Sequence, residues 1–269
     1  MKSLRARPRS PLLASFVKSF HYHESDLPFT LERIVPNGQA HLMINLAEDE
    51  FRTYDPGQTE RMSRHSGVVL AGPHARSIVI DTREQRWLAA VEFQSGGAAP
   101  FFSMPASEFG NQVVGLDHLW GRNGKLLRER LLETPTPAAM FCVLEQILLQ
   151  YCAPRFDPAT QYAVNALKLG MPLPKLTAKL GLLPRTLVRR FSSQVGITPK
   201  RFARVQRLQR VLRAVRRSQY PDWCALASQY GYADQSHLVH EFRELAGVTP
   251  SGYTPHSPQR NNHILILPL

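Results

Sequence analysis

One pattern occurs twice in the second half of the chain, and this duplication constrains the fold more than any other feature. Leu187-Val188, Phe191 and Gly196-Ile197-Thr198-Pro199 are matched, 51 positions later, by Leu238-Val239, Phe242 and Gly247-Val248-Thr249-Pro250. Within each copy the Leu and the Phe are four residues apart, so they share the buried face of one helix. A glycine precedes each copy, Gly181 in the first and Gly231 in the second, and predicts a tight turn. The chain is therefore expected to contain two similar helical units in tandem.

Each unit has the order helix, short turn, helix. The first is predicted over residues 176–180 and 184–195, and the second over residues 222–230 and 235–245, with Asp234 as the N-cap of its second helix. This is the pattern of a helix-turn-helix motif, whose second helix lies in the major groove of DNA. One such pattern is a weak signal, because many helical pairs share it. Two copies at a matched offset are a much stronger one.

A long helix is predicted between the units, over residues 199–218. Its buried stripe consists of Phe202, Val205, Leu208, Leu212 and Val215. An arginine recurs at every third position from Arg201 to Arg216, so the positive charge winds around the helix. A helix of about twenty residues spans roughly 30 Å, and successive major grooves on one face of DNA are about 34 Å apart. The linker helix therefore suits two recognition helices in adjacent grooves.

The positive charge of the chain lies in one half. Residues 1–150 contain equal numbers of basic and acidic side chains, and the formal charge of +12 comes from the remainder. No acidic residue lies between Asp157 and Asp222, whereas fourteen Lys or Arg do. This asymmetry favours a polyanionic partner for one domain over a merely solubilising surface, which usually mixes both signs.

The sequence also limits where the protein acts. It has no apolar run near the roughly 18 residues of a membrane span and no signal-peptide pattern at its start, so we expect a cytoplasmic, nucleoid-associated protein with no membrane partner. Three cysteines without CxxC spacing fit a reducing compartment.

The first half has the alternation of antiparallel strands. Ala40, Leu42, Ile44 and Leu46 fall on one face of a strand, and His41, Met43 and Asn45 on the other. Short strands of this kind over residues 28–93 predict a β-barrel or sandwich. Helices are then expected over residues 125–132 and 137–151. The apolar stripe of the second helix, Phe141, Leu144, Leu148 and Tyr151, either packs on its own domain or forms a dimer seam.

The predicted fold is thus α+β: an N-terminal antiparallel β-barrel or sandwich, then an all-α domain with two helix-turn-helix motifs joined by a long linker helix. The boundary is expected at Pro154-Arg155-Phe156-Asp157-Pro158. The domains would be residues 1–153, residues 154–258 and a tail of residues 259–269. The apolar run from His263 to Leu267 in this tail has no predicted role.

Specific motifs carry a family resemblance over residues 158–253. They are Leu180-Gly181-Leu182, Pro184-Arg185-Thr186-Leu187, Arg189-Arg190-Phe191, Thr198-Pro199 and Phe202 in the first unit, and Ala225-Leu226-Ala227, Gly231-Tyr232, Asp234-Gln235-Ser236-His237-Leu238, Phe242-Arg243, Gly247-Val248-Thr249-Pro250-Ser251 and Tyr253 in the second. These resemble the DNA-binding domain of AraC/XylS-type transcriptional regulators. Arg33-Ile34-Val35-Pro36-Asn37-Gly38, Leu42 with Asn45-Leu46, Ala71-Gly72-Pro73 and Gly96-Gly97-Ala98 look like the cupin-like sensor domain of one branch of that family.

Two positions depart from the family pattern. Leu183 replaces the usual Ser or similar residue that caps the first recognition helix, and His240 stands where many members have Arg. A missing cap costs on the order of 1 kcal/mol. The shorter His240 side chain, without a fixed charge at neutral pH, weakens the expectation that the second recognition helix reads bases. We therefore expect the first recognition helix to contribute more affinity.

The resemblance implies a sequence-specific transcription factor rather than an enzyme, with no cofactor. Its partners would be double-stranded promoter or operator DNA and a small-molecule effector in the N-terminal domain, with RNA polymerase and a second copy of the chain as further candidates. The alternative is a metal-dependent cupin enzyme with an accessory DNA-binding domain, because His21 and His23 point the same way on a strand. No other ligands occur at useful spacing, so we expect no metal.

Three sets of residues are candidates for function. The expected base-reading residues are Arg185, Val188, Arg189, Gln235, Ser236 and His240. The expected phosphate contacts are Thr198, Lys200, Arg190 and Arg243. Arg pairs with guanine O6 and N7, Gln with adenine, and an apolar side chain with the thymine methyl group; a phosphate contact remains the alternative for Arg189 and Ser236. The candidate effector contacts are His41, Asn45, Trp87 and Glu92.

Overall fold

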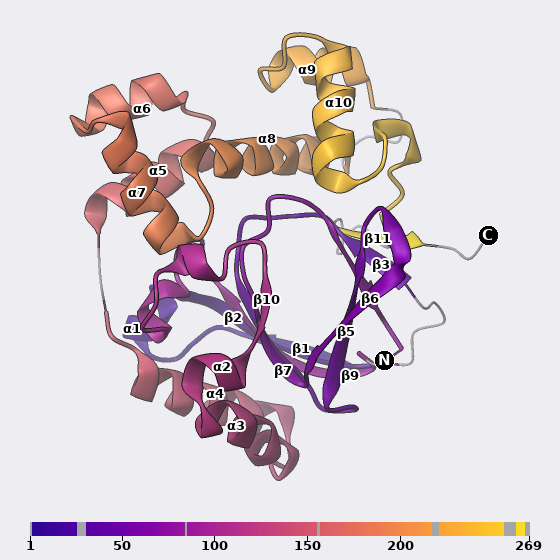
Figure 1. Cartoon of the computed structure of the whole chain (residues 1–269), viewed down its shortest axis with the longest axis vertical. Helices are drawn as coiled ribbons and strands as arrows, with labels where there is room; N and C mark the ends of the chain where they lie inside the picture. Colours follow the sequence, from indigo (N-terminus) through magenta and orange to yellow (C-terminus); the bar gives the residue numbers. More distant parts are fainter. Residues whose placement is uncertain are drawn as a thin grey trace.

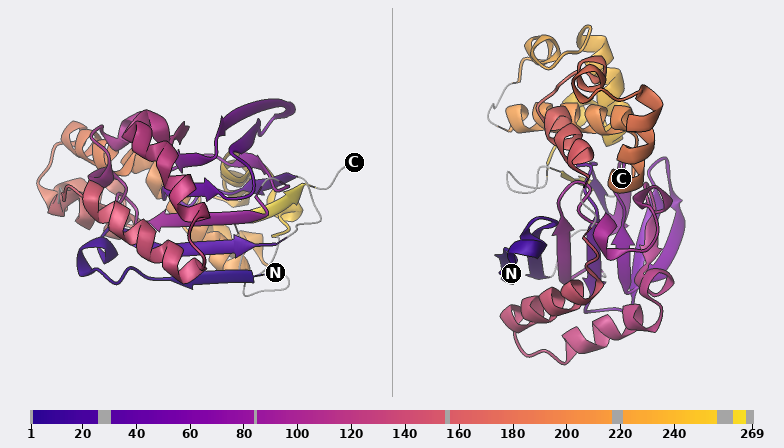
Figure 2. Two further views of the ribbon diagram at one scale, coloured as in Figure 1. Left: turned by 90° about the horizontal axis from the view of Figure 1, so that it is seen from below. Right: turned by 90° about the vertical axis from the view of Figure 1, so that its left-hand side faces the viewer.

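The computed structural model describes residues 2–25, 31–83, 85–154, 157–216, 221–255 and 262–266. Two antiparallel sheets with flanking helices form the first part of the chain, and helices form the second (Figure 1). The linker helix lies across one end of the sheets, so the two parts are packed against each other (Figures 1 and 2). Within the described residues, no helix is both long and apolar enough to cross a membrane.

The two sheets face each other as a sandwich and do not close into a barrel, which decides between the two predicted forms. The first sheet has the order β1 (Lys2–Ala6), β2 (Val17–Glu24), β9 (Trp87–Phe93), β4 (His41–Asn45), β7 (Val68–Ala71) and β10 (Val113–Gly115). The second has the order β11 (His263–Ile266), β3 (Leu31–Ile34), β8 (Ile78–Asp81), β5 (Glu50–Asp55) and β6 (Gln58–Ser66). All the pairings are antiparallel.

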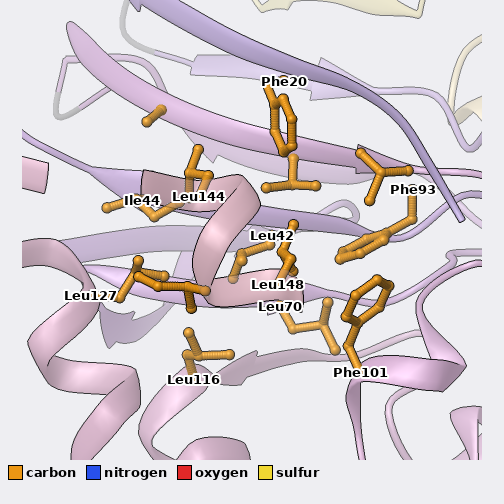
Figure 3. Close-up of a cluster of buried hydrophobic side chains, with 14 of the residues drawn as sticks. Phe20, Leu42, Ile44, Leu70, Phe93, Phe101, Leu116, Leu127, Leu144 and Leu148 are labelled. Carbon is orange, nitrogen blue, oxygen red and sulfur yellow. The ribbon is translucent and has the colours of Figure 1, made fainter. Parts of the chain in front are cut away.

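The main hydrophobic core lies between the first sheet and four helices. These helices are α1 (Pro11–Ala14), α2 (Leu116–Trp120), α3 (Arg122–Leu132) and α4 (Pro137–Tyr151). Two short 3-10 turns, η1 (Ala99–Phe101) and η2 (Ala106–Glu108), lie between β9 and β10 in the sequence. Leu42 and Ile44 of β4 meet Leu144 and Leu148 of α4 in this core (Figure 3). The stripe of α4 therefore packs on its own domain, the first of its two predicted alternatives. Thr136 caps α4, and its side chain accepts a hydrogen bond from the Ala139 N–H.

The helical part contains the predicted elements. They are α6 (Leu173–Leu180), α7 (Pro184–Val195), α8 (Pro199–Val215), α9 (Trp223–Gln229) and α10 (Gln235–Ala246), preceded by one more helix, α5 (Pro158–Lys168), and followed by the turn η3 (Pro250–Gly252). Gly196 and Gly247 end α7 and α10 with φ of 92° and 75°, in the left-handed region that favours glycine. Helix α6 starts three residues before the predicted position, and residues 217–218 of the predicted linker helix lie outside the described residues.

The apolar tail forms a strand that its sequence did not reveal. Residues 263–266 make β11, which pairs antiparallel with β3 and forms the edge of the second sheet, with His263 opposite Ile34 and Ile266 opposite Leu31. The chain thus returns from the helical domain to the first domain. Leu267, the last residue of the apolar run, lies outside the described residues.

Candidate nucleic-acid interface and sensor cavity

Helix α7 buries one face and exposes a basic one. Leu187, Phe191 and Val195 are buried. The predicted DNA contacts Arg185, Val188, Arg189 and Arg190 are exposed. In the described part of the chain, no hydrogen bond or ion pair engages the side chains of these three arginines, so they can reach a ligand. The N-cap residue Leu183 is 59% exposed and offers no side-chain acceptor to the first turn.

Helix α10 has the same arrangement, and a side chain caps its N-terminus. The Asp234 carboxylate accepts a hydrogen bond of 2.7 Å from the His237 N–H and caps the helix. Leu238 and Phe242 are buried. The predicted contacts Gln235, Ser236, His240 and Arg243 are exposed. Recognition helices α7 and α10 pack near opposite ends of α8 (Figure 1), as the length of the linker helix predicted.

Two arginines of the basic series on α8 pair with acidic side chains within the protein. Arg207 donates a hydrogen bond of 2.6 Å to the Glu241 carboxylate of α10, and Arg204 donates one of 2.8 Å to the same group. Glu241 is only 3% exposed. Arg204 also pairs with Glu244, and this hydrogen bond, opposed by burial, raises the pKa of Arg204. Glu241 and Glu244 therefore hold α10 against α8, so they do not oppose DNA as free charges.

The predicted phosphate contacts at the start of α8 lie at a capped helix N-terminus. The Thr198 hydroxyl accepts a hydrogen bond of 3.3 Å from the Arg201 N–H, and Lys200 is exposed. The N-terminal end of a helix attracts anions, because its first N–H groups and the helix dipole are both positive.

A cavity of about 240 Å³ lies between the two sheets. The alternation of β4 explains it: Leu42 and Ile44 fill the core under the helices, whereas His41 and Met43 face the second sheet and line the cavity. The apolar part of its wall includes Ile34, Phe51, Val69, Ile78, Ile80, Leu88 and Val113, and about as many polar side chains complete the lining. Burial lowers the pKa of His41 to about 4, so this imidazole is neutral at pH 7.

Of the four candidate effector contacts, only His41 lines this cavity. The Asn45 side chain instead stabilises the turn after β4, donating to the Glu50 carbonyl and accepting from the N–H groups of Ala47 and Glu48. Trp87 lines a separate hollow. Sequence reasoning missed Glu32 and His263, which lie in the cavity wall and are joined by a hydrogen bond of 2.8 Å.

Glu92 belongs to an ion cluster. Lys18 lies 2.6 Å from its carboxylate, Arg5 3.1 Å and His21 3.2 Å. Burial of Glu92 raises its pKa, but the hydrogen bonds from His21 and Lys18 outweigh this effect and hold the pKa well below the usual value.

The two candidate metal ligands, His21 and His23, have different surroundings. His21 is hydrogen-bonded to Glu92, and His23 lines the cavity. No group of three or more potential metal ligands is found among the residues that the structure describes.

The comparisons with known proteins follow the division of the chain. Residues 176–255 match a family model described as a helix-turn-helix domain. Residues 176–255 of this chain are an AraC-type helix-turn-helix domain. Residues 5–115 match a domain of unknown function, DUF6597. A search of curated proteins finds no match to the sequence.

Solved structures of ToxT from Vibrio cholerae are similar over most of the chain. An apo lysine-to-alanine variant of ToxT is 11% identical, with a TM-score of 0.46 over 87% of this chain and 96% of that one. ToxT bound to (E)-4-(8-methylnaphthalen-1-yl)but-3-enoic acid is 10% identical, with a TM-score of 0.47 over 87% and 97% of the two chains. In the helix-turn-helix domain of this chain, α7 and α10 are the second helices of the two motifs.

Proposed function

We propose that this protein is a one-component transcription factor whose two recognition helices bind successive major grooves of a promoter or operator. The observation that carries the proposal is the pair of exposed faces on α7 and α10, held near opposite ends of one helix. A DNA-binding protein of the AraC/XylS type needs that arrangement to engage both grooves at once.

The exposed side chains divide into two roles. We assign base reading to Arg185, Val188 and Arg189 on α7 and to Gln235, Ser236 and His240 on α10. We assign phosphate binding to Arg190, Thr198, Lys200 and Arg243. The hydroxyl of Thr198 already accepts a hydrogen bond, so its hydrogen would be donated to the phosphate oxygen.

The same proposal gives the sensor domain an effector. The cavity between the sheets supports this part, because an enclosure that combines apolar walls with polar groups able to orient a ligand is typical of a small-molecule site. His41 would contact the effector. A cytoplasmic location at the nucleoid follows from the function. A second copy of the chain and RNA polymerase are the protein partners that such a regulator would have.

The test is selection of duplex DNA from a random pool by the full-length protein. Enrichment of a motif with two conserved blocks, one helical turn apart, is expected. The affinity for the selected site should also fall steeply with salt, by roughly 10³–10⁵-fold between 50 and 200 mM if about 6–10 phosphates are contacted. A pool without any enriched motif, bound with a flat salt response, would contradict the proposal. Nothing observed here favours the alternative of a cupin enzyme.

A further inference from the structure

The core of the second helix-turn-helix unit is completed by residues from outside it. Most of this core consists of residues of α8, α9 and α10, such as Leu208, Leu238 and Phe242. It also contains Val35, from the loop after β3, and Ile264, from β11, which are 1% and 4% exposed. Within the described residues, the buried core of the first unit has no member from the sandwich. Of the two buried clusters, only that of the second unit therefore includes residues of the sensor domain, although α7 of the first unit also contacts the turns η1 and η2.

Hydrogen bonds strengthen this connection. Gln209 of α8 donates to the Pro36 carbonyl at 2.7 Å and to the Asn262 side-chain oxygen at 2.9 Å. Gln206, one turn earlier, donates to the Asn37 carbonyl at 2.8 Å. The linker helix is thus bonded both to the loop after β3 and to the residue that precedes β11. Both glutamines are buried, so breaking these bonds without replacement would be costly.

The segments that hold the linker helix also form one wall of the cavity. Val35, Pro36 and Asn37 line it from the loop, and Asn262 and His263 line it from the tail. Each segment therefore has the cavity on one side and the second unit on the other. A molecule in the cavity would contact the parts of the chain that position α10.

The charges around the cavity indicate what it can accept. Glu32, 1% exposed, is hydrogen-bonded to His263, and Arg52 is paired with Glu50 and Glu48. His41 is neutral at pH 7. Because these side chains have partners within the protein or are uncharged, a charged ligand would lose its hydration without gaining a new counter-ion. The volume of about 240 Å³ is below the roughly 300–1,000 Å³ typical of pockets for drug-sized ligands.

We propose that this cavity binds a small, uncharged, mostly apolar molecule, and that the loop Val35-Pro36-Asn37 and strand β11 transmit its presence to the second helix-turn-helix unit. The inference rests on the proposed function in one respect, because it makes the cavity the effector site. The proposal implies that ligand binding tightens the packing of β11 and α10 against the sandwich and leaves the first unit unchanged. Ligand-bound and ligand-free protein then differ in the contribution of α10 to DNA affinity.

Three related probes test the ligand class on the full-length protein: indole, which is uncharged, indole-3-acetate, an anion, and tryptamine, a cation. Calorimetry should show that indole binds at least about tenfold more tightly than either charged analogue, because burial of an unpaired charge is costly. Ala71→Leu, which adds volume to the cavity wall, should abolish binding; Val69→Phe serves if that variant does not fold. Tighter binding of a charged analogue, or no binding of indole, overturns the ligand class.

Hydrogen exchange tests the transmission without using DNA. Indole should slow exchange of the Leu265 and Ile266 amides of β11 by about fivefold or more, the lower range of known couplings. Exchange in α7 should stay unchanged. Indole binding with no change in β11 would overturn the transmission, and equal slowing in α7 would overturn its restriction to the second unit.

A matched pair of variants connects the cavity to DNA. Ile264 is buried in the core of the second unit, whereas Ile266 on the same strand is only half-buried, and neither lines the cavity. Ile264→Ala should bind indole within about twofold of the wild type but lose its effect on operator affinity, and Ile266→Ala should keep both. If both variants keep the effect, the transmission through Ile264 is wrong. Failure of the wild type to bind any duplex would count against the proposed function only, because indole binding and hydrogen exchange are measured without DNA.

Discussion

The Glu241 carboxylate of the second recognition helix accepts a hydrogen bond of 2.6 Å from the Arg207 guanidinium of the linker helix. The same guanidinium lies 4.3 Å from the centre of the Tyr232 ring, in the turn between α9 and α10. One side chain thus joins the linker helix to the turn and the recognition helix of the second unit.

Loss of this arginine should act through stability. Arg207→Ala leaves the buried Glu241 with Arg204 as its remaining cation and should destabilise the protein by about 1.5–3 kcal/mol. Arg216→Ala, at an exposed position near the end of the same helix, is the matched control and should change the stability by less than about 0.5 kcal/mol. Urea unfolding at pH 7 measures both, and equal effects would refute the internal role.

The first recognition helix should gain stability from a cap. Leu183→Ser adds a side-chain oxygen at a position that offers none and is 59% exposed, so little packing is lost. The expected stabilisation is up to about 1 kcal/mol. Leu183→Ala is the control, because it removes the same exposed side chain without supplying an acceptor. Thermal unfolding of the two variants should separate them in favour of Ser; a Ser variant no more stable than the Ala variant would show that the helix needs no cap.

Base-reading and phosphate-binding residues should differ in their specificity profiles. Arg185→Ala and Arg189→Ala should each relax the preference at particular bases, at a cost of roughly 1–3 kcal/mol. Lys200→Ala should weaken binding to all sequences and reduce the salt slope by about 1. Binding titrations with the selected site and with random DNA check this. An Arg185→Ala variant that loses equal affinity for both would lack the proposed base contact.

The second recognition helix should gain DNA affinity from a fixed charge. His240 is exposed on α10, at a position that we propose faces the DNA. An arginine is always charged and reaches further than an imidazole, so His240→Arg should bind the selected site more tightly at pH 7. Binding titrations of the two proteins measure this difference. Weaker binding by His240→Arg would mean that His240 faces away from the DNA.

The ion cluster in the sandwich should affect acid stability. The pKa of Glu92 is held below the usual value of 4.5, so the cluster stabilises the fold above about pH 4.5, and this contribution is lost as the pH falls further. Glu92→Gln should be less stable than the wild type at pH 7, and the difference should shrink progressively below pH 4.5. A difference that stays constant from pH 7 to pH 3 would exclude a charge effect.

The helical domain was predictable because its signals are local. Pro184 starts α7 and Gly196 ends it, Asp234 caps α10, and the repeated Leu and Phe mark the buried faces. Each of these features depends on residues within three or four positions, which is the reach of one helical turn. The same locality made the exposed arginines of α7 identifiable as candidate DNA contacts.

What the sequence could not determine depends on residues far apart in the chain. Glu241 meets Arg207 across 34 positions, and β11 pairs with β3 across about 230, so neither contact has a local pattern. Asn45 lies on the same face of β4 as His41, and Glu92 lies opposite His41 on β9. Only the register of β2, β4 and β9 decides that Glu92 meets Lys18 and His21, whereas His41 lines the cavity. The sequence alone thus determined the helices and their exposed faces. Tertiary structure decided which charges are internal and where the cavity lies, because both depend on the pairing of distant strands and helices.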